Sequence, residues 1–159
     1  MKSPASPTEY VRRAQPRSSL ELVTRSEFLY PGSMNRYQHV DIRVTDLTAA
    51  RAFYSKLLPA IGFPKQGGKV FTVFDAEGEP PQAPWFGFIE DKQHRPNANR
   101  IAFWAESREE VDRMAEIVRE AGGRISSGPR ECPEYTATYY AVFFEDPSGN
   151  CLEVCHLTD

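Results

Sequence analysis

Two stretches of this chain repeat the same pattern at a fixed spacing, and this repeat limits the possible folds more than any other feature. A shift of 61 residues places His39 on Arg100, and residues 39–44 of the alternating run 38–44 on the run 100–105. Each run is followed by a helix-capping residue, an apolar stripe at helical spacing and a glycine stop. The caps are Asp46 and Ser107, and the stops are Gly62 and Gly123. Because one period relates strand, cap, helix and stop, the sequence predicts a duplicated unit.

Further β-rich runs complete each unit. They are 70–74 and 85–89 in the first unit, and 124–127, 139–145 and 151–156 in the second. Between the last two runs lies Asp146-Pro147-Ser148-Gly149-Asn150, whose proline presets φ and whose glycine and asparagine tolerate positive φ, as a hairpin turn requires. We therefore predict two βαβββ units, at about 35–92 and 97–157.

The apolar stripe of each predicted helix has to be buried, so each helix should cover one face of a small sheet. The opposite faces carry polar and aromatic side chains: His39, Asp41, Arg43, Arg100, Trp104 and Glu153. We expect Asp41 and Arg43, two positions apart on one face, to form a salt bridge near the rim. Glu153 alternates with Leu152 and Val154, so it points away from the helix, towards water or into a cavity. The pattern predicts an α+β fold in which two half-barrel sheets enclose a small-molecule site.

The composition restricts the class of protein further. A chain of 159 residues with 40% hydrophobic and 26% charged residues fits one compact domain. Its net charge of −3 gives no support for a nucleic-acid surface. The longest apolar run, 139–144, is too short to span a membrane. The 3 cysteines have no spacing typical of a structural zinc site, so we expect a reducing, cytoplasmic location.

The first 34 residues differ from the rest of the chain. They contain several prolines, serines and basic residues and show no sustained periodicity. We expect residues 1–34 to be a poorly ordered arm, and residues 35–157 to be the folded domain.

Two βαβββ units, a histidine in the first strand and the motif Asp-Pro-Ser-Gly-Asn-Cys-Leu-Glu153 resemble the vicinal oxygen chelate superfamily. That superfamily includes glyoxalase I, type I extradiol dioxygenases, fosfomycin resistance proteins and bleomycin resistance proteins. The resemblance covers roughly residues 35–157. It implies a homodimer and a cavity with one divalent metal ion (Zn, Ni, Mn or Fe) bound by His39 and Glu153. The implied enzyme is a lyase, isomerase or dioxygenase in which Glu153 moves a proton.

The ligand set implied by this resemblance is incomplete in this chain. Arg100 stands where the second unit would supply a histidine, and a guanidinium has no lone pair for a metal. The first-unit counterpart of Glu153 falls near Gly87, or at Glu90 if the strands are offset. Glu90 or His94 could complete the three ligands of a catalytic site, although His94 lies in a loop and is expected to be solvated.

Three accounts of His39, Arg100 and Glu153 stay open at this stage. They bind a metal in an enzyme, or Arg100 replaces the metal's charge in a metal-free binder or isomerase, or they form a polar network without chemistry. In the second account Arg100 pairs with Glu153 or binds a ligand carboxylate. Trp104 and one of Tyr139 and Tyr140 could stack on a planar ligand; adjacent strand residues face opposite ways, so only one of these tyrosines can line the cavity. A non-catalytic protein of the bleomycin-resistance type is the alternative to an enzyme.

We predict that the chain folds without its N-terminal arm, because every strand, cap and apolar stripe lies after Met34. A chain that begins at Met34 should be soluble and should give the circular dichroism spectrum of a folded α+β protein. An insoluble or unfolded product would show that the arm belongs to the core or to an interface.

Overall fold

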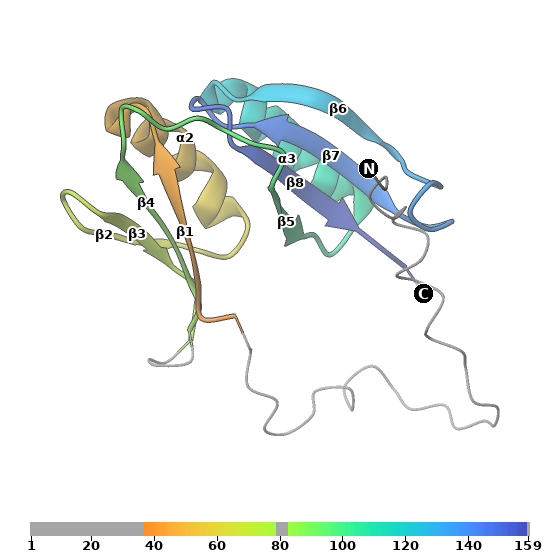
Figure 1. Ribbon diagram of the computed structural model, residues 1–159. Coiled ribbons are helices and arrows are strands. Elements are labelled where there is room, and N and C mark those ends of the chain that lie inside the picture. Colours follow the sequence, from red (N-terminus) through yellow and green to blue (C-terminus); the bar gives the residue numbers. More distant parts are fainter. Residues whose placement is uncertain (1–36, 79–82, 159) are drawn as a thin grey trace. The chain divides into compact units, whose positions relative to one another are not determined.

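The computed structural model describes residues 37–78 and 83–158, all within one compact unit that spans residues 35–159. The expectation for residues 1–34 therefore lies outside the described residues. The first half of this unit contains β1 (His39–Val44), α2 (Leu47–Ala60), β2 (Lys65–Gly67), β3 (Thr72–Asp75) and β4 (Trp85–Glu90). The second half contains β5 (Arg100–Trp104), α3 (Arg108–Ala121), β6 (Arg124–Glu131), β7 (Tyr140–Glu145) and β8 (Cys151–His156) (Figure 1).

Two sheets with the same topology confirm the predicted duplication. Their strand orders are β1-β4-β3-β2 and β5-β8-β7-β6, and in each sheet the first strand runs parallel to the last. Asp41 pairs with Gly87 in the first sheet, and Ala102 pairs with Glu153 in the second. Gly87 therefore occupies in the first sheet the place that Glu153 occupies in the second. This register decides between the two counterparts left open by the sequence, Gly87 and Glu90.

Both helices begin at the predicted caps. The Asp46 carboxylate accepts hydrogen bonds from the backbone N–H groups of Thr48 and Ala49 at 2.8 and 3.0 Å, which satisfies two donors of the first turn of α2. Ser107 accepts one from the backbone N–H of Glu110 at 3.2 Å at the start of α3. In a capping box, the Glu110 carboxylate would accept a hydrogen bond from the backbone N–H of Ser107. Here it accepts one from the backbone N–H of Glu106 instead.

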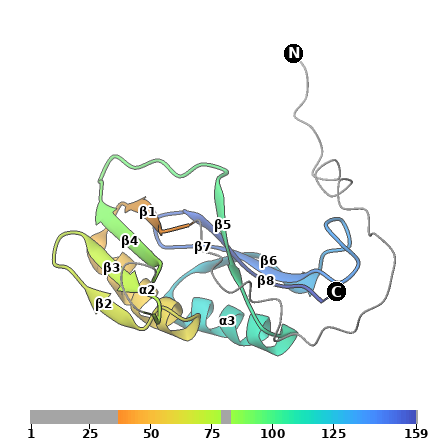
Figure 2. The ribbon, with the colours of Figure 1, turned by 90° about the horizontal axis from the view of Figure 1, so that it is seen from below.

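The two helices cover the faces of the sheets opposite Glu153 and Tyr139, and the two halves share one hydrophobic core. Figure 2 shows α2 and α3 side by side on the same side of the sheets. The largest fully buried side chains come from both halves: Tyr54, Phe53, Phe74, Phe86, Phe88, Phe144, Leu57, Leu58, Met114 and Leu152. Burying rings and aliphatic chains of this size is the main favourable term in folding. Neither α2 nor α3, the helices of the described ranges, has the length and apolar character needed to cross a bilayer.

Two strands differ from the sequence prediction. The short edge strand β2 is not predicted, because Lys65, Gln66 and Gly67 are all exposed and show no apolar alternation. The predicted strand 124–127 continues to Glu131 as β6, with register irregularities between Ile125 and Ser127 and between Ser127 and Arg130. Proline and glycine in the sequence Gly128-Pro129 favour ending a strand, but an irregular edge strand tolerates both.

The hairpin turn between β7 and β8 is built around the buried carboxylate of Asp146. One oxygen accepts the backbone N–H groups of Ser148 and Asn150 at 2.8 and 2.9 Å, and thereby closes the turn. The other oxygen accepts the phenol O–H of Tyr54 in α2 at 2.8 Å. Burial, followed by the nearby Asp146 charge, raises the pKa of Tyr54 well above its ordinary value, so the phenol remains a donor. This carboxylate therefore connects the second half directly to the helix of the first.

Other residues of the same turn also bind the first half. The Ser148 hydroxyl accepts the backbone N–H of Thr45 at 2.9 Å, and the Asn150 amide donates to the carbonyl of Arg43 at 2.9 Å. The His94 Nε2 lies 2.9 Å from the Asn150 side-chain oxygen. His94, which the sequence places in a solvated loop, is half-buried, because the tertiary fold brings its loop against the turn. The turn thus holds the two halves together through several separate hydrogen bonds.

We predict that Tyr54→Phe destabilises the protein by about 1.5–3 kcal/mol, because it removes a buried hydrogen bond to a charged acceptor. Tyr140→Phe is a matched control, since the phenol of Tyr140 donates to Asp112 at the same 2.8 Å but at an exposed site. The control should cost less than about 1 kcal/mol. Urea unfolding of the three proteins measures both changes. Equal losses of unfolding free energy in the two variants would show that the buried hydrogen bond between Tyr54 and Asp146 stabilises the protein no more than the exposed one.

Candidate functional site

A cavity of about 500 Å³ lies where residues of the first sheet meet β5 of the second. Its lining residues come from both halves of the unit: Tyr37, His39, Val40, Phe63, Pro84, Trp85, Phe86, Arg100, Ile101, Ala102 and Phe103. The volume is within the range of small-molecule sites, and the lining is mainly apolar with a few polar groups, as such sites usually are. His39 and Arg100, which the 61-residue repeat relates to each other, therefore line the same cavity.

The wall from the first half is aromatic. The rings of His39 and Trp85 are stacked with centroids 4.0 Å apart and planes 3° from parallel. Phe71 packs edge-on against Trp85 at 5.6 Å. A Cβ at Gly87 would lie 2.6 Å from the Phe71 ring and 2.7 Å from the Trp85 ring. Glycine is therefore needed at position 87, because the two rings occupy the space of a side chain.

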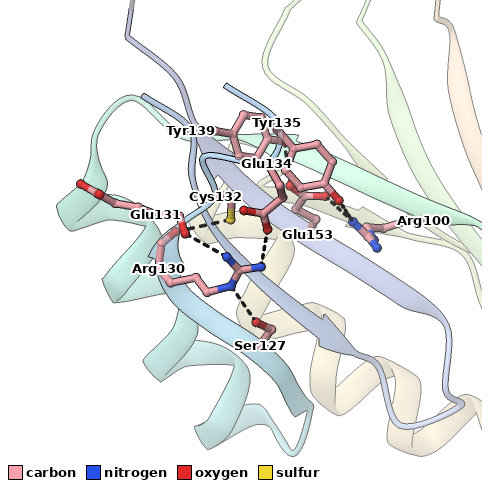
Figure 3. A network of polar contacts seen from close by, with 9 residues as sticks. All are labelled: Arg100, Ser127, Arg130, Glu131, Cys132, Glu134, Tyr135, Tyr139 and Glu153. Atoms are coloured by element: carbon pink, nitrogen blue, oxygen red, sulfur yellow. Dashed lines mark hydrogen bonds and ion pairs between the residues drawn. The ribbon is translucent and has the colours of Figure 1, made fainter. Parts of the chain in front are cut away.

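The second half contributes a buried carboxylate at the place that corresponds to Gly87. The Glu153 side chain is only 6% exposed, and one of its oxygens lies 3.2 Å from Nη1 of Arg100. The other oxygen accepts the phenol O–H of Tyr139 at 2.7 Å. Figure 3 shows these groups together with Tyr135 on the face of the sheet opposite α3. The sequence left water and a cavity as alternatives for Glu153; in the structure the side chain is buried in this hydrogen-bonded network, and Glu153 is not among the residues that line the cavity.

Arg100 is held from several sides but is not fully enclosed. Its Nη1 also lies 3.4 Å from the phenol oxygen of Tyr135, and its guanidinium carbon lies 4.7 Å above the ring of Phe143. Burial acts to lower the pKa of Arg100, but the hydrogen bonds to Tyr135 and Glu153 outweigh it and raise the pKa. With 40% of its side chain exposed, Arg100 is a permanent cation that solvent can still reach.

Tyr139, Cys155 and Cys132, which lie near Glu153, stay protonated at neutral pH. Burial, the contact with Cys155 and the Glu153 carboxylate all raise the pKa of Tyr139 far above its ordinary value. Burial also raises the thiol pKa of Cys155 and of Cys132, although Tyr139 and Arg130 act in the opposite direction. Since only thiolates ligate metals well, this environment gives no support to cysteine as a soft ligand.

None of the three aromatic residues considered as ligand contacts, Trp104, Tyr139 and Tyr140, is among the residues that line the cavity. The Tyr140 side chain projects to the helix side of β7, where its O–H bonds to Asp112 of α3 at 2.8 Å. Trp104 is on the expected face of β5, but it is 61% exposed at the strand end and does not line the cavity. Of the adjacent tyrosines, Tyr139 is the one that faces Glu153. The expected salt bridge between Asp41 and Arg43 is present at 2.7 Å.

The aromatic wall was missed by sequence reasoning. Trp85 shares a face with Gly87 by strand alternation, which is a signal that the sequence contains. The stacking partner of Trp85 depends on the pairing of His39 with Trp85, however, and that pairing brings together strands far apart in the chain. No local pattern specifies such a register.

The side chains present do not fit a resident divalent metal ion. The four positions related by the repeat carry His39, Gly87, Arg100 and Glu153, of which only the histidine and the carboxylate are ligand types. The carboxylate is already bonded on both oxygens. The imidazole Nδ1 of His39 contacts the side-chain oxygen of Gln38.

The two residues considered as a third ligand have other partners. One oxygen of Glu90 accepts the backbone N–H of Leu47 at 3.2 Å, at the start of α2. His94 faces Asn150. Across residues 37–78 and 83–158, no group of three or more His, Cys, Asp or Glu side chains gathers in a way that could hold a metal ion. A metal at this cavity would therefore have only His39 and a carboxylate engaged by Arg100.

Comparison with known proteins agrees with this fold. The uncharacterised protein YqjT of Bacillus subtilis strain 168 is 30% identical over 128 residues, which cover 73% of this chain and 94% of the relative. A glyoxalase/bleomycin resistance protein from Albidiferax ferrireducens T118 superimposes with a TM-score of 0.64 and 23% identity, and covers 78% of this chain and 100% of its own. The fosfomycin resistance protein FosX of Listeria monocytogenes gives 0.57 and 22%, over 76% and 91% of the two chains.

At these identities the two solved structures establish likeness of fold alone, and a shared fold does not fix a shared activity. The family model adds evidence from the sequence itself, independently of the coordinates. The model of the Glyoxalase/Bleomycin resistance protein/Dioxygenase superfamily matches residues 36–154, which extend from before β1 into β8, and this chain therefore belongs to that superfamily.

Proposed function

We propose that this protein binds a small organic anion in the cavity between its two halves, without a resident metal ion, and that Arg100 recognises the anion. The observation that carries this proposal is the place of Arg100, which stands at the strand position equivalent to His39 and lines the same cavity. Among the described residues of the cavity wall, Arg100 is the one with a permanent charge. An anion is the ligand that such a wall attracts.

The guanidinium of Arg100 has donors left for a ligand. Both hydrogen bonds that Arg100 makes within the described residues, to Tyr135 and to Glu153, use Nη1. Nε and Nη2 lie along the other edge of the planar group. Two parallel donors of this kind match the two oxygens of a carboxylate.

Glu153 serves in this proposal to position Arg100. A buried carboxylate is costly unless it is paired, so Glu153 keeps the guanidinium close, and the Phe143 ring supports it from one side. Both carboxylate oxygens are engaged, which favours ligand binding over proton transfer by Glu153. The binding or sequestration alternative therefore fits the geometry better than a metal-dependent lyase or dioxygenase.

Calorimetric titration with two kinds of ligand tests this function. The first kind is a pair of acids, 2-naphthoate and decahydro-2-naphthoate, each compared with its primary amide. We predict that chelator-treated protein binds each acid at least about tenfold more tightly than its amide, because an ionic hydrogen bond is worth about 1.5–3 kcal/mol. Adding Zn, Ni or Mn should not change this preference. Arg100→Met should abolish it, whereas the control Arg124→Met, which removes an exposed arginine paired with Glu145, should keep it.

The second kind of ligand is the metal ion itself. Arg100→His should raise the affinity for Zn, Ni or Mn, because it adds a ligand and removes a cation that repels the ion by several kcal/mol at an effective dielectric constant of about 20. Tight stoichiometric metal binding by the unmodified chain, unaltered by Arg100→His, would contradict the proposed function. Equal affinity of acids and amides would contradict it as well.

We also predict that Arg100 and Glu153 are coupled in stability. Arg100→Met should cost about 1–2 kcal/mol, a value reduced for the partial exposure of the arginine, because it leaves a buried carboxylate without its cation. The double variant Arg100→Met with Glu153→Gln should recover part of that loss, since no buried charge remains. Denaturant unfolding gives the coupling free energy through a double-mutant cycle. Additive losses would mean that the two side chains do not support each other.

A further inference from the structure

We infer that the ligand of this cavity is an aromatic monocarboxylate, with its ring against the stacked pair His39–Trp85 and its carboxylate on Arg100. This inference rests on the proposed anion-binding function and adds the chemical class of the anion. It uses features of the cavity that neither the Arg100–Glu153 pair nor the fold explains: the concentration of aromatic rings in the wall and their rigid arrangement.

Aromatic rings form most of the wall that is not charged. They belong to Tyr37, His39, Phe63, Trp85, Phe86 and Phe103. Two of these rings pack against each other across the halves, since Phe86 of β4 and Phe103 of β5 have centroids 5.8 Å apart and planes tilted by 44°. Phe63 packs edge-on against the same Phe103 ring at 6.3 Å. These contacts hold the rings of the wall in a fixed arrangement, with the Phe86 ring itself buried in the core.

The stacked pair provides a flat surface that is fixed before any ligand arrives. The ring planes of His39 and Trp85 are 3° from parallel, so the two stacked rings form one flat surface. Phe71 holds Trp85 from the side, and the lack of a side chain at Gly87 lets both rings lie close to the strand. A surface that is ordered in advance loses little conformational entropy on binding, and a planar ring is the shape it accommodates best.

The charge of the cavity wall limits the ligand to one carboxylate. Arg100 is the single permanently charged side chain among the described lining residues, and Glu153 already balances part of its charge. A second carboxylate on the ligand would enter the apolar part of the cavity without a partner, which is unfavourable. A volume of about 500 Å³ accommodates a fused two-ring acid with room for further substituents.

The two acids and two amides used to test the proposed function distinguish a preference for an aromatic ring from a preference for a carboxylate. The unmodified protein should bind 2-naphthoate about three- to tenfold more tightly than decahydro-2-naphthoate, the gain expected for aromatic packing beyond buried area. Trp85→Leu should remove this ring preference and retain the preference of each acid over its amide. Phthalate-type diacids, tested as naphthalene-2,3-dicarboxylate, should bind more weakly than the monoacid.

A measurement on the intact chain keeps the test valid if Trp85→Leu does not fold. The chain has 2 tryptophans, so a ¹H–¹⁵N spectrum contains 2 indole N–H signals, and Trp104→Phe assigns them. Titration with 2-naphthoate should shift the signal of Trp85 strongly and that of exposed Trp104 little. If the acids bind through Arg100 but 2-naphthoate binds no more tightly than decahydro-2-naphthoate, or if the Trp85 signal does not shift, this inference is overturned and the proposed function still stands. Acids that bind no better than their amides would overturn both.

Discussion

The structure depends on one buried carboxylate, that of Asp146, more than on any other polar group. It closes the turn between β7 and β8 through two backbone N–H groups, and it accepts the O–H of Tyr54 from the helix of the other half. A buried charge is tolerated only when its acceptor sites are filled, and here the filling groups come from both halves. The same bonds that satisfy the carboxylate thus fix how the two halves meet.

That junction determines the shape of the cavity. Ser148 and Asn150 in the same turn bind the backbone at Thr45 and Arg43, next to the end of β1. Strand β1 is thereby held near β5, and the residues at the starts of these strands, His39 and Arg100, line one cavity. The chemistry of the site is therefore produced by the contact between two units, each of which contributes a different wall.

The two units have kept their topology and diverged at equivalent positions. Gly87 makes room for aromatic rings in the first sheet, whereas Glu153 holds a cation in the second. A symmetric set of ligands would build a metal centre, but this asymmetric set combines an apolar, planar wall with a positive charge. The superfamily shares a fold, and a shared fold leaves the ligand to the side chains that line the cavity.

The sequence by itself determined the local structure and the duplication. Alternation, the caps Asp46 and Ser107 and the turn around Asp146 act over a few residues, so they could be recognised without coordinates. Local patterns could not show the exposed edge strand β2, the projection of Tyr140 towards α3, or the stacking of His39 on Trp85. Each of these depends on strand register or on packing between distant segments. Only the tertiary structure decided them, because a contact between residues far apart in the chain leaves no periodic trace in the sequence.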